Sequence, residues 1–224
     1  ELLYYGYRVS GLCEYSSFEE VCFILLYGRL PNPKELLDFN TTLRQERNVP
    51  EKILEIVTRL PKETHYMDVL RSGISLLSHY DPQCEDNSLA QEQAKAIRML
   101  AKAPTILAAR VRSKCGEKII APHTSLGHAA NFLYMVFGKE PDADSAKALD
   151  ASLICYGEHG FNASTFTARV ITSTLADTYS AVVGAIGALK GPLHGGANEH
   201  AMHMLLEIGE PAKAENYIKE RLAK

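Results

Sequence analysis

The chain has 224 residues, of which 46% are hydrophobic and 23% charged, and its 24 basic and 27 acidic side chains give a net charge of -3. This balance offers no electrostatic reason to expect a nucleic acid or an anionic membrane as a partner. The most apolar stretch, residues 181–189, is far shorter than the ~18 apolar residues that cross a bilayer. The sequence therefore predicts a globular protein with no membrane segment.

Cysteines are scattered along the chain, with no Cys-x-x-Cys pair: they are Cys13, Cys22, Cys84, Cys115 and Cys155. An odd and unclustered set is typical of free thiols in a reducing compartment, so we expect a cytoplasmic protein. The chain opens with Glu-Leu-Leu-Tyr-Tyr, without an initiator methionine and without the pattern of a signal peptide. This opening predicts a piece of a longer protein.

Apolar residues recur at helical spacing through most of the chain, which predicts an all-α fold. Ser16 or Ser17 caps the first helix, whose first turn carries two glutamates and which stops at the Pro-Asn-Pro sequence of residues 31–33. The helices expected after it cover residues 34–47, 50–60, 67–77, 89–112, 128–137, 143–156, 197–208 and 212–222.

A long region rich in small residues, 164–190, predicts further helix with a break near Asp177. Pro104 predicts a kink in the helix of residues 89–112. Only residues 118–120 look extended, and we find no internal repeat. Short connections between the helices favour one compact helical domain over the whole chain.

The chemistry-bearing residues are densest in two segments, and the second is built around His194. Gly191 and Pro192 end one helix, and Gly195 and Gly196 free the backbone just before the next helix begins. The positive end of a helix dipole disfavours a charged imidazole. A neutral imidazole there can donate a hydrogen bond to an oxygen that gains charge, such as a thioester carbonyl becoming an enol. The alternative is a histidine that only shapes the turn.

The first segment carries His159, Asn162 and Ser164 within six residues. Imidazole, amide and hydroxyl groups together can bind a small carboxylate or keto acid. The alternative interpretation is local, because Gly160 and Asn162 are common where helices stop, and Ser164 or Thr165 could cap the following helix.

Other histidines give weaker signals. His200 and His203 are three residues apart on one predicted helix, beside Glu199, as in some metal sites. The sequence has no His-Glu-x-x-His motif and no third ligand at a diagnostic spacing, so we expect a solvated helix face and no metal. His65 is expected to shape or cap a turn. Phosphate-binding glycine loops and the Gly-x-Ser-x-Gly hydrolase elbow are absent.

The two segments, read together, resemble a known family. His-Gly-Phe-Asn-Ala-Ser-Thr-Phe at residues 159–166, followed by Gly-Pro-Leu-His-Gly-Gly-Ala-Asn-Glu at residues 191–199, is similar to the citrate synthase signature. Further matches lie at residues 6–8, 18–21, 26–31, 65–71, 131–133 and 138–141. The resemblance covers essentially the whole chain and implies the multi-helical large domain of the citrate synthase fold.

The resemblance implies a Claisen condensation of acetyl-CoA with oxaloacetate, giving citrate and CoA, with acyl-CoA as a substrate and no cofactor. Matched residue by residue, His194 is the histidine that stabilises the enol, and Ser164 orients it. His159 and Asn162 line the oxaloacetate pocket. The family's aspartate base, its second catalytic histidine, its carboxylate-binding arginines and its small domain are expected outside residues 1–224, so we expect the chain alone to be inactive.

The sequence departs from the family pattern in two places that matter. Residues 4–7 read Tyr-Tyr-Gly-Tyr where relatives usually have Tyr-Arg-Gly-Tyr, and residues 158–161 resemble forms found in 2-methylcitrate synthases and some bacterial citrate synthases. Propionyl-CoA is therefore an alternative to acetyl-CoA. A non-catalytic helical assembly module, in which both segments are only caps and turns, is the alternative from a different functional class.

A homodimer is also expected. Small residues recur at every fourth position of the helix before His194, at Ala176, Ser180, Gly184 and Ala188. Such a strip lets another helix approach closely, although packing within one chain would explain it equally well. The family is built around helix-rich dimer contacts, which supports the dimer.

Overall fold

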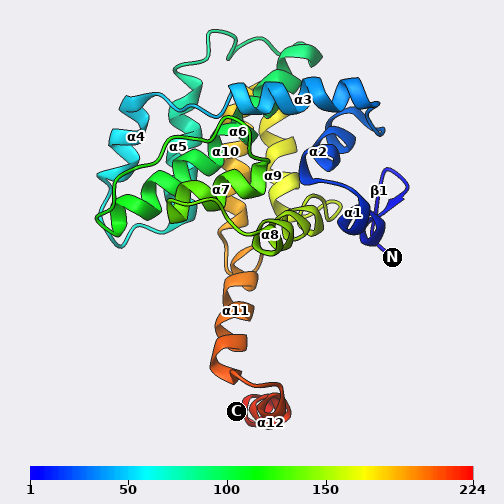
Figure 1. Cartoon of the computed structure of the whole chain (residues 1–224), viewed down its shortest axis with the longest axis vertical. Coiled ribbons are helices and arrows are strands. Elements are labelled where there is room, and N and C mark those ends of the chain that lie inside the picture. Colours follow the sequence, from blue (N-terminus) through cyan, green and yellow to red (C-terminus); the bar gives the residue numbers. More distant parts are fainter. Residues whose placement is uncertain (224) are drawn as a thin grey trace.

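The computed structural model describes residues 1–223, and its regular secondary structure is almost entirely helical, which confirms the predicted fold class (Figure 1). In chain order the elements are β1 (Leu3–Tyr4), β2 (Tyr7–Arg8), α1 (Val9–Tyr15), α2 (Phe18–Tyr27), α3 (Pro33–Gln45), α4 (Glu51–Thr58), α5 (Tyr66–Ser78), α6 (Leu89–Lys114), α7 (His128–Phe137), α8 (Ala143–Cys155), α9 (Ala163–Thr172), α10 (Thr178–Leu189), α11 (Gly196–Ile208), a 3-10 turn at Pro211–Lys213 and α12 (Ala214–Leu222).

Most helices agree closely with the sequence-based ranges, and α7 has the predicted bounds, but α1 lies outside every predicted range. The small-residue region divides at Asp177, whose carboxylate caps α10 by accepting from the Ser180 N–H at 2.9 Å. Helix α6 continues through Pro104. Residues 118–120 are irregular, and within residues 1–223 the paired strands lie instead at the start of the chain, around a turn with Tyr5 at φ 47° and Gly6 at φ 89°.

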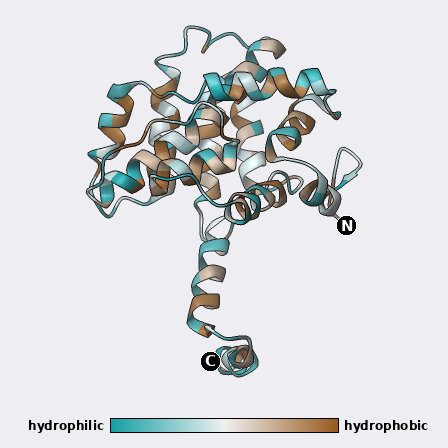
Figure 2. Ribbon diagram, in the orientation of Figure 1, coloured by the Kyte–Doolittle hydropathy of each residue, from teal (hydrophilic) through white to brown (hydrophobic). Residues whose placement is uncertain are grey.

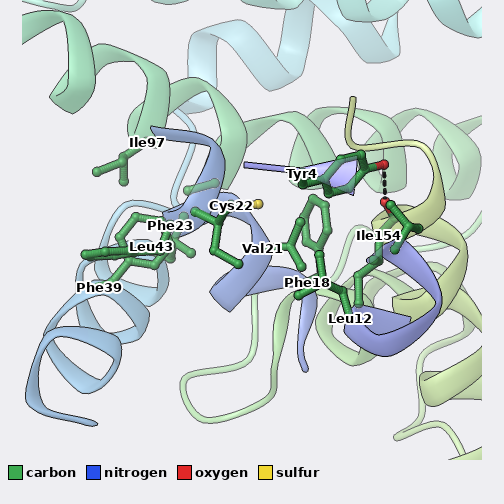
Figure 3. Packing of buried hydrophobic residues seen from close by; sticks show 13 residues of the cluster. Tyr4, Leu12, Phe18, Val21, Cys22, Phe23, Phe39, Leu43, Ile97 and Ile154 are labelled. Carbon is green, nitrogen blue, oxygen red and sulfur yellow. Dashed lines mark hydrogen bonds between the residues drawn. The ribbon is translucent and has the colours of Figure 1, made fainter. Parts of the chain in front are cut away.

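Two apolar clusters form the core, and α6 contributes to both. The first gathers Tyr4, side chains of α1, α2 and α3, and Ile154 from α8 (Figure 3). The second joins α4, α5 and α10. Hydrophobic and hydrophilic residues alternate along these helices, as the colours of Figure 2 show, so each helix turns one face to a cluster. Burial of these faces holds the helices that carry the site.

Arg110 on α6 is buried in this frame without a carboxylate partner among residues 1–223. Its guanidinium donates to the carbonyl oxygens of Thr58 (3.2 Å), Leu60 (2.8 Å) and Pro61, just after α4. These bonds pair the guanidinium with carbonyls at and just beyond the end of α4. They also fix the connection that leads into α5.

The last helices extend away from the main body, with α11 leading to α12 at the far end (Figure 1). Within residues 196–223 only Ile208 is buried. The apolar side chains of Met202, Leu205 and Leu206 are exposed on α11. Among the described residues no helix is long and apolar enough to cross a membrane.

Candidate active site

The turn between α10 and α11 carries His194, as the sequence predicted. The His194 N–H donates to Gly191 O at 2.9 Å, and its carbonyl accepts from the Ala197 N–H at 3.0 Å. A Cβ atom at Gly195 would lie 2.5 Å from Leu189 O and 2.7 Å from Leu189 Cδ1. A Cβ atom at Gly196 would lie 2.9 Å from Gly191 O. Two consecutive positions therefore exclude any side chain, and this close approach sets where His194 stands.

Two polar pairs hold this turn against the start of α5. Lys190 precedes the turn and pairs with Asp68, and the ammonium group lowers the pKa of the Asp68 carboxyl. Glu199 follows the turn, and its Oε2 lies 3.1 Å from His65 Nε2, a contact that lowers the pKa of Glu199. His65 caps α5, because its Nδ1 accepts from the Met67 N–H at 3.1 Å. The expected capping role of His65 is confirmed. Its contact with Glu199 of α11 was not predicted from the sequence.

His194 contacts Ser164 at the start of α9. Nε2 of His194 lies 2.8 Å from Ser164 Oγ and 3.3 Å from the Ser164 backbone nitrogen. A backbone N–H can only donate, so the Ser164 N–H makes Nε2 the accepting nitrogen, and a neutral ring carries its proton on Nδ1. The single proton of the Ser164 hydroxyl goes to Asn162 Oδ1, so the hydroxyl does not donate to His194 as well. The imidazole is thus held at one nitrogen and keeps an N–H donor at the other.

Asn162 is hydrogen-bonded to Ser164. Its Oδ1 accepts from Ser164 Oγ at 2.7 Å and from the Thr165 N–H at 2.9 Å, and so Asn162 caps α9. The sequence had offered Ser164 or Thr165 for that cap. Because Oδ1 is occupied, the amide nitrogen of Asn162 is the group left to donate to a ligand. The cap therefore orients both Asn162 and Ser164.

His159 lies just after α8. Its Nε2 lies 2.8 Å from Cys155 O, and since a carbonyl can only accept, Nε2 carries a proton and Nδ1 remains for a ligand. The same end of α8 is held by Tyr4, whose hydroxyl donates to Ile154 O at 2.8 Å and accepts from the Glu158 N–H at 3.1 Å. The first strand of the chain thereby supports the segment that carries His159.

The four side chains named from the sequence line one cavity of about 520 Å³. Its wall consists of Tyr156, Gly157, Glu158, His159, Asn162, Ser164, Thr165, Leu189, His194, Gly195 and Asn198. The structure therefore brings together His159, Asn162 and Ser164 from one segment of the chain and His194 from another. Three lining residues are additions to the predicted set: Tyr156 and Glu158 lie just before the first motif, and Asn198 lies within the second.

The cavity suits a small oxygen-rich ligand. It offers two imidazole nitrogens and an amide, and the one carboxylate that the described residues contribute to its wall is Glu158. Glu158 Oε1 already accepts from the Gly160 N–H. Within residues 1–223 no three His, Cys, Asp or Glu side chains cluster as metal ligands; His203 and Glu199 on α11 approach to 3.9 Å.

Fold and cavity together define a helical protein whose polar site is assembled from a helix end and two helix starts. The model of the family described as citrate synthase, C-terminal domain, matches residues 1–224, and the chain belongs to the citrate synthase family. A 2-methylcitrate synthase of Mycobacterium tuberculosis is 49% identical over 223 residues, covering 100% of this chain and 56% of the relative. A citrate synthase of Deinococcus radiodurans is 46% identical over 221 residues, covering 99% of this chain and 59% of the relative.

A solved structure agrees with these sequence matches. It is the citrate synthase of Thermoplasma acidophilum in a ternary complex with carboxymethyl coenzyme A and oxaloacetate. The two share 29% sequence identity with a TM-score of 0.88, over 96% of this chain and 56% of that one. The chain thus spans little more than half the length of the relatives that it matches.

The Gly195→Ala substitution tests the close approach at the turn. The added methyl group should meet Leu189 and displace the turn, and we expect a loss of about 1–3 kcal/mol in the free energy of unfolding. The ring signals of His194 in an NMR spectrum should shift as well. Urea unfolding measures the first effect.

The matched control is Gly11→Ala in α1, where an added Cβ atom would meet nothing within 4 Å. Alanine has the higher helix propensity, so this variant should be as stable as the parent or more so. Equal stabilities for Gly195→Ala and the parent protein would contradict the steric constraint.

Proposed function

We propose that this chain provides the enol-stabilising histidine and part of the oxaloacetate pocket of an enzyme that condenses an acyl-CoA with oxaloacetate. The observation that supports it is the contact of His194 with Ser164 in a cavity that His159 and Asn162 share. Family membership supplies the reaction class. The proposal needs no cofactor, since acyl-CoA is consumed as a substrate, and we place the reaction in the cytoplasm.

The reaction begins with loss of a proton from the carbon next to the thioester carbonyl. The electron pair that is left moves toward the carbonyl oxygen, and an N–H donor at His194 Nδ1 stabilises the developing charge. The enol carbon then attacks the ketone carbon of oxaloacetate, forming the new carbon–carbon bond. Water finally cleaves the thioester to release CoA. The Ser164 backbone N–H keeps the imidazole in the tautomer that can donate, which is a positioning role.

Citrate formation from acetyl-CoA is our first candidate, and the first step of the tricarboxylic acid cycle would be its setting. The alternative, 2-methylcitrate formation from propionyl-CoA, has support in the 49% identity to the Mycobacterium tuberculosis 2-methylcitrate synthase. Steady-state kinetics with both thioesters distinguishes the two, because the ratio of their kcat/KM values measures the preference of the acyl pocket.

The His194→Ala substitution tests the central role. In a protein of the relatives' length that contains these residues, it should lower kcat by two to three orders of magnitude, on the order of removing one oxyanion donor. Oxaloacetate affinity, measured by calorimetry, should stay within about threefold, since the histidine acts on charge that develops later. The control His200→Ala removes an exposed histidine of α11 and should leave kcat unchanged. Near-normal turnover in His194→Ala would refute the assignment.

The 224-residue chain by itself should not release CoA from acetyl-CoA and oxaloacetate at a measurable rate. Neither Asp150 nor Asp177 is a candidate base: Asp150 accepts from the Phe18 N–H at 3.1 Å and lines a separate cavity, and Asp177 caps α10. Loss of one member of a cooperating catalytic set removes several orders of magnitude in rate.

A thiol-release assay measures this activity, and oxaloacetate binding without turnover is the result we expect. Turnover comparable to an intact synthase would contradict the proposal. If that turnover disappeared in Glu158→Gln, the base would be Glu158, the one carboxylate that the described residues contribute to the cavity wall.

We also propose a homodimer, on grounds that differ from the strip of small residues. Gly184 of that strip lies against Thr167 and Ile171 of α9 in the same chain, so packing of α9 on α10 accounts for it. The stronger support is α9 itself, in which no residue is buried. Phe166 and Val170 are 56% and 50% exposed there. A second copy covering these side chains would remove apolar surface from water.

Sedimentation at micromolar concentration should therefore find a dimer, and Val170→Glu should convert it to a monomer by placing a charge in the contact. The matched control is Leu37→Glu on α3, which changes an equally exposed apolar side chain away from α9 and should leave the dimer intact. A monomeric parent protein at this concentration would count against the proposal.

A further inference from the structure

Two cysteines from distant parts of the chain lie in contact beside the cavity. Cys13 belongs to α1 and Cys155 is the last residue of α8, and these helices pack against each other. Their Sγ atoms are 3.4 Å apart, although the residues are separated by 142 positions. A disulfide has an S–S distance of about 2.05 Å, so a small movement would allow the bond to form.

The two thiols differ in access to solvent. Cys155 is exposed, whereas Cys13 is half-buried, with its Sγ 3.8 Å from Ala151 O. Burial, followed by the hydrogen bond with Cys155, raises the pKa of the Cys13 thiol. Cys155 is therefore the thiol that an oxidant from solution meets first, and Cys13 stands behind it as the thiol that can resolve the product.

The backbone of Cys155 is part of the support of the cavity. Its carbonyl accepts from His159 Nε2 at 2.8 Å and from the Tyr4 hydroxyl at 3.2 Å. The next residue, Tyr156, lines the cavity itself. A pull on the Cys155 side chain toward α1 would move the carbonyl that fixes the ring of His159.

We propose that Cys13 and Cys155 form a redox modification site, which a peroxide converts to a disulfide that displaces His159. The Cys155 thiolate attacks one oxygen of hydrogen peroxide and breaks the O–O bond, and the proton that the thiol lost goes to the departing hydroxide, so a sulfenic acid and water result. The Cys13 thiol then attacks the sulfenic sulfur, forms the S–S bond and releases a second water. Two thiols are oxidised by two electrons and the peroxide is reduced; a dithiol reverses the change.

Peroxide treatment followed by peptide mass spectrometry without reductant tests the cross-link. We expect one dominant linked peptide pair, Cys13 with Cys155, the loss of two titratable thiols, and full recovery after dithiothreitol. Cys13→Ser and Cys155→Ser should each abolish the link. Cys115→Ser is the matched control, because it removes another exposed cysteine and should leave the link unchanged. Oxidation of Cys155 to sulfinic or sulfonic acid without a link to Cys13 would overturn the proposal.

The effect on His159 has its own readouts. The NMR signals of the His159 ring should shift on oxidation of the parent protein and not of Cys13→Ser; an unchanged ring would overturn the coupling. Weaker oxaloacetate binding, by about tenfold, is expected in the cross-linked protein, and this arm rests on the proposed function. If the reduced protein fails to bind oxaloacetate while the His159 ring still shifts, the proposed function fails and the redox site stands.

Discussion

The chain between α10 and α11 turns through a space that admits no side chain at two consecutive positions. A methyl group at Gly195 would meet the carbonyl of Leu189 at 2.5 Å, which is well inside contact distance. The backbone cannot shift easily to make room for a side chain, so the steric constraint at Gly195 also restricts the position of His194, one residue earlier. The imidazole needs no long side-chain network to stand at the start of α11, because the backbone already places it there.

Apolar packing stabilises the site, and polar contacts orient it. The pairs Lys190–Asp68 and His65–Glu199 are exposed to solvent, and ion pairs in such positions contribute little to stability. They cannot hold the turn by themselves. The two buried clusters fix α5, α6 and α10, and the polar pairs then decide how the turn sits on that frame. Interactions this weak can select among nearby arrangements of a helix start even though they add little to stability.

Much of this arrangement can be read from the sequence, and the exceptions have a common cause. Amphipathic helices such as α7 can be predicted from the periodicity of their apolar residues. The positions of His194 and Ser164 can be predicted from the turn and cap residues around them. Two-residue strands are too short to show an alternation of apolar and polar residues, so the sequence did not predict the hairpin at Tyr4. The strip of small residues around Gly184 could not distinguish a dimer contact from packing within the chain, because close helix packing favours the same small residues in both cases. Contacts such as Cys13 with Cys155 join residues 142 positions apart, and spacing carries no signal over such a separation.

The Tyr4 hydroxyl joins the first strand to the end of α8, across 154 residues to the Glu158 N–H. Contacts between such distant residues close a long loop and form late in folding. At a synthesis rate of about 5–20 residues per second, Tyr4 would leave the ribosome on the order of ten seconds before its partner. Its buried ring and the cluster around it (Figure 3) are without their α8 neighbours during that interval. The wall that carries His159 is therefore among the last parts of the molecule to be assembled, although its support is among the first to be made.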